Sequence, residues 1–115
     1  DVRLLADALP SGTPGFIAAL SPGSAARLNN RYYDDEHQLL ADVGRAMRTE
    51  YQAITDAGLT VQFDAPDLAE AWDQINPEPS VEDFRGFIRE RIDVLNDSIA
   101  GLPKEQTRLH ICWGS

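Results

Sequence analysis

A histidine and a cysteine two positions apart, His110 and Cys112, are the residues whose types and spacing best suit chemistry. They belong to residues 108–113, a segment with the composition of a β-strand. Side chains i and i+2 of a strand point to the same face, so this imidazole and thiolate can reach one zinc ion. The intervening apolar residues, Leu109 and Ile111, would then point into a packed layer. Zinc needs four ligands and this pattern offers two, so the tripeptide by itself favours a strand whose His and Cys merely lie in the core or at its rim.

Asp64 is the second candidate, because it ends a segment in which apolar and polar residues alternate. This segment, residues 59–64, is expected to be a strand that places Gln62 and Asp64 on one face. Ligands bind at the carboxyl ends of strands in barrels and doubly wound sheets, which favours a binding role for Asp64. Residues 64–67 also have a composition typical of turns, so a role for Asp64 in capping a turn or a helix fits as well.

The elements that position these residues alternate between strands and helices. One long amphipathic helix is expected between Asp34, which can cap it, and Gly58, and another between Ser80 and Gly101. The shorter expected elements are a helix over residues 1–9, a strand over 16–20, an irregular loop over 21–33 and a helical turn within 67–76. This order predicts a parallel sheet with right-handed crossovers and with the helices outside.

The predicted sheet is small for a complete domain of this class. Three strands leave two open edges and apolar helix surface without a cover. An eight-stranded β/α barrel typically needs about 250 residues, more than twice the 115 residues here. The fold expected is therefore α/β, with residues 1–115 forming a fragment of a (β/α)8 TIM-type barrel and no second domain.

The composition of the chain limits the classes of partner that it is expected to bind. The chain has 10 Lys and Arg against 19 Asp and Glu, giving a net charge of −9, which disfavours nucleic acids and anionic membrane surfaces. No apolar run approaches the roughly 20 residues of a membrane span. A single cysteine cannot form an internal disulfide, so the cytoplasm is the expected compartment.

Several segments together resemble one enzyme family. Residues 54–68, Ile-Thr-Asp-Ala-Gly-Leu-Thr-Val-Gln-Phe-Asp-Ala-Pro-Asp-Leu, resemble the "ADAG…Q-I-D-E-P-A-L" strand of cobalamin-independent methionine synthases. Residues 109–112, Leu-His-Ile-Cys, resemble the "H-x-C" strand of that family. Residues 30–33 and the ending Cys-Trp-Gly-Ser look closer to its single-domain relatives, which include the epoxyalkane:coenzyme M transferases.

The resemblance implies a barrel that holds zinc at the carboxyl ends of its strands. It matches His110 and Cys112 to two zinc ligands, and Asp64 to a carboxylate that helps to hold the amino group of homocysteine. The implied reaction is methyl transfer from 5-methyltetrahydropteroyl-glutamate to homocysteine, in which a zinc-held thiolate attacks the methyl carbon. The implied partners are a thiol substrate and a small-molecule alkyl donor.

Departures from the family pattern keep other interpretations open. Ala65 replaces the acidic residue that follows this Asp in the synthases, which leaves epoxide–thiol transfer of the coenzyme M type as an alternative. The remaining zinc ligands are expected beyond Ser115, so the fragment is expected to be inactive alone. A non-catalytic half-barrel that acts in assembly or binding, as an oligomer through its exposed sheet edges, is the other alternative.

Overall fold

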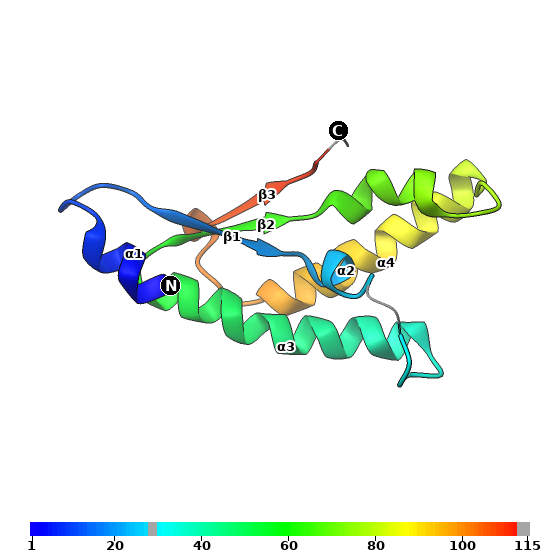
Figure 1. Ribbon diagram of the computed structural model, residues 1–115, viewed down its shortest axis with the longest axis horizontal. Coiled ribbons are helices and arrows are strands. Elements are labelled where there is room, and N and C mark those ends of the chain that lie inside the picture. Colours follow the sequence, from blue (N-terminus) through cyan, green and yellow to red (C-terminus); the bar gives the residue numbers. More distant parts are fainter. Residues whose placement is uncertain (28–29, 113–115) are drawn as a thin grey trace.

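The sheet of this protein consists of three parallel strands, as Figure 1 shows for the computed structural model, which describes residues 1–27 and 30–112. The strands lie in the order β1-β2-β3. The elements are α1 (Val2–Ala8), β1 (Phe16–Leu20), α2 (Pro22–Ala25), α3 (Glu36–Asp56), β2 (Thr60–Asp64), the 3-10 helices η1 (Pro66–Leu68) and η2 (Glu70–Gln74), α4 (Val81–Ile99), the 3-10 helix η3 (Lys104–Gln106) and β3 (Thr107–His110). The expectation of a mixed α/β fold with a parallel sheet is confirmed.

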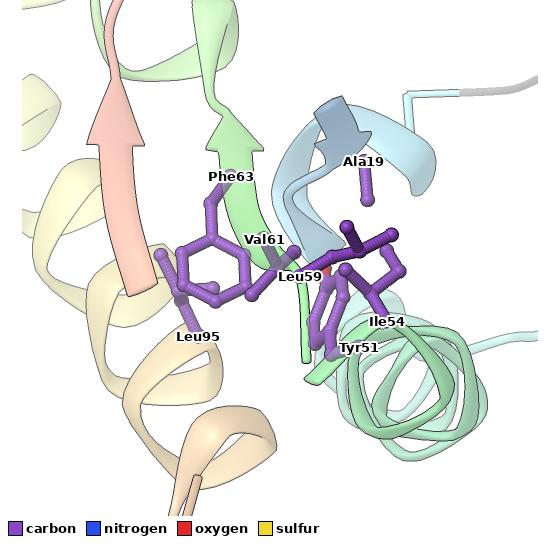
Figure 2. Packing of buried hydrophobic residues seen from close by; sticks show 7 residues of the cluster. All are labelled: Ala19, Tyr51, Ile54, Leu59, Val61, Phe63 and Leu95. Atoms are coloured by element: carbon purple, nitrogen blue, oxygen red, sulfur yellow. The ribbon is translucent and has the colours of Figure 1, made fainter. Parts of the chain in front are cut away.

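Both long helices pack against the same face of the sheet. Val61 and Phe63, on the central strand β2, are buried and point to this face. They form one core cluster with Tyr51 and Ile54 of α3 and with Leu95 of α4, as Figure 2 shows. The sheet is therefore covered by helices from one side, and burial of these side chains is the main force that holds the two helices on it.

The opposite face of the sheet is exposed along its whole length. Strand alternation and the parallel register assign eight residues to this face, and every one of them is at least partly exposed. They are Phe16, Ala18 and Leu20 of β1, Thr60, Gln62 and Asp64 of β2, and Arg108 and His110 of β3. Two large apolar side chains, Phe16 and Leu20, are 48% and 46% exposed. No helix among the described residues covers this face.

The ends of the two long helices follow the expected capping chemistry. Asp35, one residue later than the expected Asp34, caps α3 by accepting a hydrogen bond from the backbone N–H of His37. Ser80, the expected start of α4, caps it by accepting a hydrogen bond from the backbone N–H of Asp83. After α3 the chain turns at Gly58, whose φ of +76° lies in the left-handed region that glycine adopts without strain.

Two expectations from the sequence were wrong in detail. The segment expected to be an irregular loop contains the short helix α2, which Ser21 caps and which begins at Pro22. A serine followed by proline at the first helical position is the signal that reveals this turn.

Strand β3 is shorter than expected and ends at His110. Leu109 and Ile111, which were expected in a packed layer, are 51% and 48% exposed. The reason is that β3 is an edge strand, with no neighbour on its outer side among the described residues. Trp113, the last residue of the expected strand, lies outside the described residues. None of the helices described is long and apolar enough to cross a membrane.

Tyr51 fastens the end of β1 to α3. Its side chain is fully buried, lies edge-on to the ring of Phe63, and donates its hydroxyl to the backbone carbonyl of Leu20 at 2.5 Å. Burial raises the pKa of Tyr51 well above its usual value of 10, so the hydroxyl stays protonated as a donor. This bond positions the carboxyl end of the first strand.

Replacing Tyr51 with Phe keeps the ring and removes this hydrogen bond. We expect Tyr51→Phe to lower the free energy of unfolding by about 1–2 kcal/mol, because the carbonyl of Leu20 loses its hydroxyl donor in a partly buried place. Urea denaturation measures the change. The matched control is Tyr32→Phe, because Tyr32 is 88% exposed and its hydroxyl removal is expected to change little. Equal stability of the two variants would contradict this role of Tyr51.

Candidate functional site

The candidate site lies where the three parallel strands end. In the sheet register Leu20 of β1 pairs with Asp64 of β2, and Asp64 pairs with His110 of β3. These three residues point to the face of the sheet that the helices leave uncovered. The fold thus brings together two of the three sequence-predicted site residues, Asp64 and His110, although 45 residues lie between them in the chain.

Asp64 and His110 are hydrogen-bonded through Oδ1 of the carboxylate and Nδ1 of the imidazole. The His110 side chain is 52% exposed and that of Asp64 is 33% exposed, so the pair is open to ligands from solvent. In a neutral imidazole one ring nitrogen carries the proton and the other has a free lone pair. When Nδ1–H donates to Asp64, the lone pair that can bind a metal is on Nε2.

The backbone on either side of this pair is held by hydrogen bonds that continue the sheet. The N–H of Ser21 donates to the carbonyl of Asp64 at 2.9 Å, and the N–H of Ala65 donates to the carbonyl of His110 at 2.9 Å. The Cα atoms of the pair are therefore fixed by the sheet rather than by flexible loops. Such a frame keeps the two side chains within reach of each other.

Cys112 follows two residues after the end of β3, and its side chain is half-buried. It does not belong to the strand, so the alternation of a strand does not assign it to the same face as His110. Its closeness to His110 comes from the chain itself, with one residue between them. The prediction that His110 and Cys112 bind one metal ion stays a prediction.

The donor types at this edge fit a zinc ion, but their number is incomplete. An imidazole nitrogen and a thiolate are the ligands that zinc prefers in proteins, and zinc normally takes four. Within residues 1–27 and 30–112, no group of three or more His, Cys, Asp or Glu side chains is arranged to hold a metal. A zinc site that uses His110 and Cys112 thus needs ligands beyond these described residues.

A polar cluster on the same face was not found from the sequence. Arg108 donates from Nε to Oε1 of Gln62 at 2.8 Å, and its guanidinium lies 3.7 Å from the centre of the Phe16 ring. This cluster spans all three strands, with Gln62 and Arg108 one row below the row that contains Asp64 and His110, and Phe16 two rows below it. The signal in the sequence was the position of Arg108 two residues before His110, which puts both side chains on one face of a strand.

A buried carboxylate ties together the loops that follow β1 and β2. Asp67 is fully buried, and its Oδ1 accepts hydrogen bonds from the hydroxyls of Ser21 at 3.0 Å and Ser24 at 2.6 Å. Its Oδ2 lies 3.6 Å from Nε of Arg91 on α4, which is beyond hydrogen-bond length. Burial lowers the pKa of Arg91, and the charge of Asp67 opposes this shift. The carboxylate thus joins both loops to α4 behind the site.

The close packing around this carboxylate depends on a glycine. A Cβ atom added at Gly23 would lie 2.1 Å from Oδ2 of Asp67 and 2.9 Å from Cγ of Arg91. Neither contact is possible without moving the buried groups. Gly23 therefore lets α2 approach the carboxylate closely enough for the two serine hydroxyls to reach it.

A second histidine pair lies between the two long helices. Nδ1 of His37, near the start of α3, pairs with Oε1 of Glu90 on α4. These side chains and Arg91 line a pocket of about 340 Å³ that also contains Leu40 and Phe87. The hydrogen bond to Glu90 raises the pKa of His37 above 6.5, and the charges of Glu90 and Asp35 add to the shift. The His37 side chain lies at the surface and is 79% exposed.

Comparison with known proteins adds no relative of this chain. No protein-family model, no curated protein and no solved structure matches it. The resemblance to the methionine synthases therefore depends only on the motifs around Asp64 and His110.

Removal of the buried carboxylate is expected to be costly. Asp67→Ala leaves Arg91 without its counter-charge and two buried hydroxyls without their acceptor, so we expect a loss of about 3 kcal/mol in the free energy of unfolding. Urea denaturation followed by circular dichroism measures this loss. Asp73→Ala, at an exposed position of η2, is the control and is expected to change stability by less than about 0.5 kcal/mol. Similar stabilities of the two variants would show that the Asp67 network contributes nothing.

The His37–Glu90 pair predicts a pH dependence. Because the folded-state pKa of His37 is raised, its stabilising contribution is complete below pH 6.5 and is lost as the pH rises through the raised pKa. An NMR titration of the imidazole is expected to show a midpoint above 6.5 that falls toward 6.5 in Glu90→Gln. A midpoint that Glu90→Gln leaves unchanged would contradict the pairing.

Proposed function

We propose that this chain is part of a (β/α)8-type barrel of a zinc-dependent enzyme that transfers a methyl or alkyl group to a thiol, as the cobalamin-independent methionine synthases do. The observation that carries the proposal is the Asp64–His110 pair at the carboxyl edge of a parallel sheet, with Cys112 two residues further along. Binding sites of barrels are built at this edge.

The arrangement of layers supports a barrel over a doubly wound sheet. A doubly wound sheet has helices on both faces, whereas the strands of a barrel have helices outside and side chains inside. Here α3 and α4 pack on one face, and strands consecutive in the sequence are neighbours in the sheet. The exposed face, which includes Phe16 and Leu20, then corresponds to the inner surface of the barrel.

The proposed chemistry is attack of a thiolate on an electrophilic carbon. A free thiol has a pKa of about 8.5, and a zinc ion beside it lowers that pKa so that the thiolate predominates near neutral pH. His110 and Cys112 would hold the zinc ion as two of its ligands. The sulfur forms a bond to the alkyl carbon while the bond from that carbon to nitrogen, or to the epoxide oxygen, breaks. The leaving atom takes up a proton.

The residue after Asp64 bears on the substrate. Ala65 is fully buried and offers no second carboxylate beside Asp64 for the amino group of an amino-acid thiol. Methyl transfer to homocysteine remains the first proposal because it follows from the larger family, and epoxide–thiol transfer of the coenzyme M type is the alternative. We place the protein in the cytoplasm, because its single cysteine gives no sign of an oxidising compartment.

A second candidate function follows from the exposed apolar residues. Phe16 and Leu20 are 48% and 46% exposed on the face of the sheet that the helices leave uncovered. At the edge of the sheet, Leu109 of β3, on the other face, and Ile111, just beyond the strand, are 51% and 48% exposed. Large exposed apolar side chains on one surface are typical of a protein–protein contact. A non-catalytic half-barrel that assembles through this surface and its strand edges would also explain these exposures.

Zinc content tests the proposed enzyme. The protein expressed from its complete gene is expected to hold about one zinc ion per chain, and Cys112→Ser and His110→Gln are each expected to lose it, because zinc sites need their full ligand set. Elemental analysis after dialysis measures the content. His37→Gln is the matched control, because His37 also pairs with a carboxylate but lies on α3, away from the sheet edge. A wild-type protein that never holds zinc above background would overturn the proposal and favour the assembly role.

A further inference from the structure

The contact between Asp64 and His110 gives Asp64 a role different from the one that the family resemblance implies. The resemblance assigns Asp64 to a substrate amino group, whereas in the structure its Oδ1 is bonded to Nδ1 of His110. We infer that Asp64 is a positioning residue that fixes the His110 ring so that Nε2 is the nitrogen that binds the metal. This inference rests on the proposed function for the metal, but not for the orientation of the ring.

The physical reason lies in the two nitrogens of imidazole. A neutral ring with its proton on Nδ1 has its lone pair on Nε2, and a carboxylate that accepts the Nδ1–H stabilises this tautomer. The same hydrogen bond fixes the rotation of the ring and makes the other nitrogen a stronger ligand. Carboxylates in this position typically change metal affinity by about 10–100-fold.

The frame around the pair supports a positioning role. Asp64 and His110 are direct neighbours across β2 and β3, and the hydrogen bonds to their carbonyls from Ser21 and Ala65 hold both backbones in place. The Asp64 side chain has only two rotatable bonds, so a fixed backbone leaves its carboxylate little freedom. The carboxylate is thus held against the ring before any metal binds.

The nearest cation on the same face is engaged elsewhere. Arg108, two residues before His110, donates to Gln62 and stacks on Phe16. Its guanidinium therefore has its own partners, Gln62 in the neighbouring row of the sheet and Phe16 one row further on. The Asp64 carboxylate therefore pairs with the imidazole of His110 and not with Arg108.

The chain contains an internal control for this geometry. His37 also pairs through Nδ1 with a carboxylate, that of Glu90. That pair joins two helices, and the His37 side chain is 79% exposed against 52% for His110. Substitutions at Asp64 are expected to affect His110 alone, and substitutions at Glu90 to affect His37 alone.

The first experiment reads the tautomer without metal. Long-range nitrogen–proton NMR of the metal-free protein, at a pH where both histidines are neutral, is expected to show His110 with its proton on Nδ1. Asp64→Ala is expected to shift His110 toward a mixture of both tautomers and to leave His37 unchanged. Asp64→Asn, which keeps the shape and one acceptor oxygen, is expected to lie between them and serves if the alanine variant does not fold. Circular dichroism checks the fold.

The second experiment measures affinity for zinc alone in the protein from the complete gene, by competition with a chelator. Asp64→Ala is expected to weaken zinc binding about 10–100-fold while the stoichiometry stays at one. Substitution of cobalt for zinc then shows by its thiolate absorption band that Cys112 still binds. Glu90→Ala is the control and is expected to leave the affinity unchanged.

The outcomes separate this inference from the proposed function. A His110 proton on Nε2 in the wild type would overturn the inference, as would an Asp64→Ala variant with unchanged tautomer and zinc affinity. An Asp64→Ala variant that changes only the KM for the thiol would show that Asp64 binds substrate instead. A wild type with the expected tautomer but no zinc would overturn the proposed function, while the tautomer change in Asp64→Ala would still support control of the ring by Asp64.

Discussion

The parallel register of the three strands is the constraint on which the rest of this structure depends. It aligns Leu20, Asp64 and His110 in one row, so that residues far apart in the sequence share one edge of the sheet. The register is held by burial of Val61 and Phe63 on the central strand, because a slip by one residue would turn these side chains out of the core. The same shift would separate Asp64 from His110. The packing of the core and the geometry of the site are therefore fixed together.

The sequence predicted the parts of this fold that follow from local periodicity. Alternation over residues 59–64 and the apolar stripe that includes Tyr51 and Ile54 each specify one buried face, and a glycine such as Gly58 marks an end by its positive φ. The sequence placed Asp64 and His110 separately on two expected strands of a parallel sheet. Their hydrogen bond could not be predicted, because it depends on exact register.

Other features depend on contacts that no short segment reveals. Asp67 looked like a turn residue, yet it is a fully buried acceptor for two serines from another loop, with Arg91 of α4 beside it. Its burial comes from α4 packing over both loops, which is a tertiary effect. The end of β3 was also overestimated, because an edge strand without an outer neighbour has fewer hydrogen bonds to extend it beyond His110. Local pattern identifies elements, whereas tertiary contacts decide where they end and which polar groups they bury.

Under the proposed function, the Asp64–His110 pair and the apolar residues of the sheet are exposed for the same reason, which is that no layer covers this face among the described residues. His110 and Asp64 are 52% and 33% exposed, so the pair lies in a largely aqueous surrounding where electrostatic interactions are weak. Stabilising a developing charge on a reacting atom works best where water is excluded. The face that carries these two residues also carries Phe16 and Leu20, whose exposure costs hydrophobic free energy. A layer that covers this face would bury the apolar residues and would also exclude water from the Asp64–His110 pair. Completion of the core and activation of the site would then be a single event.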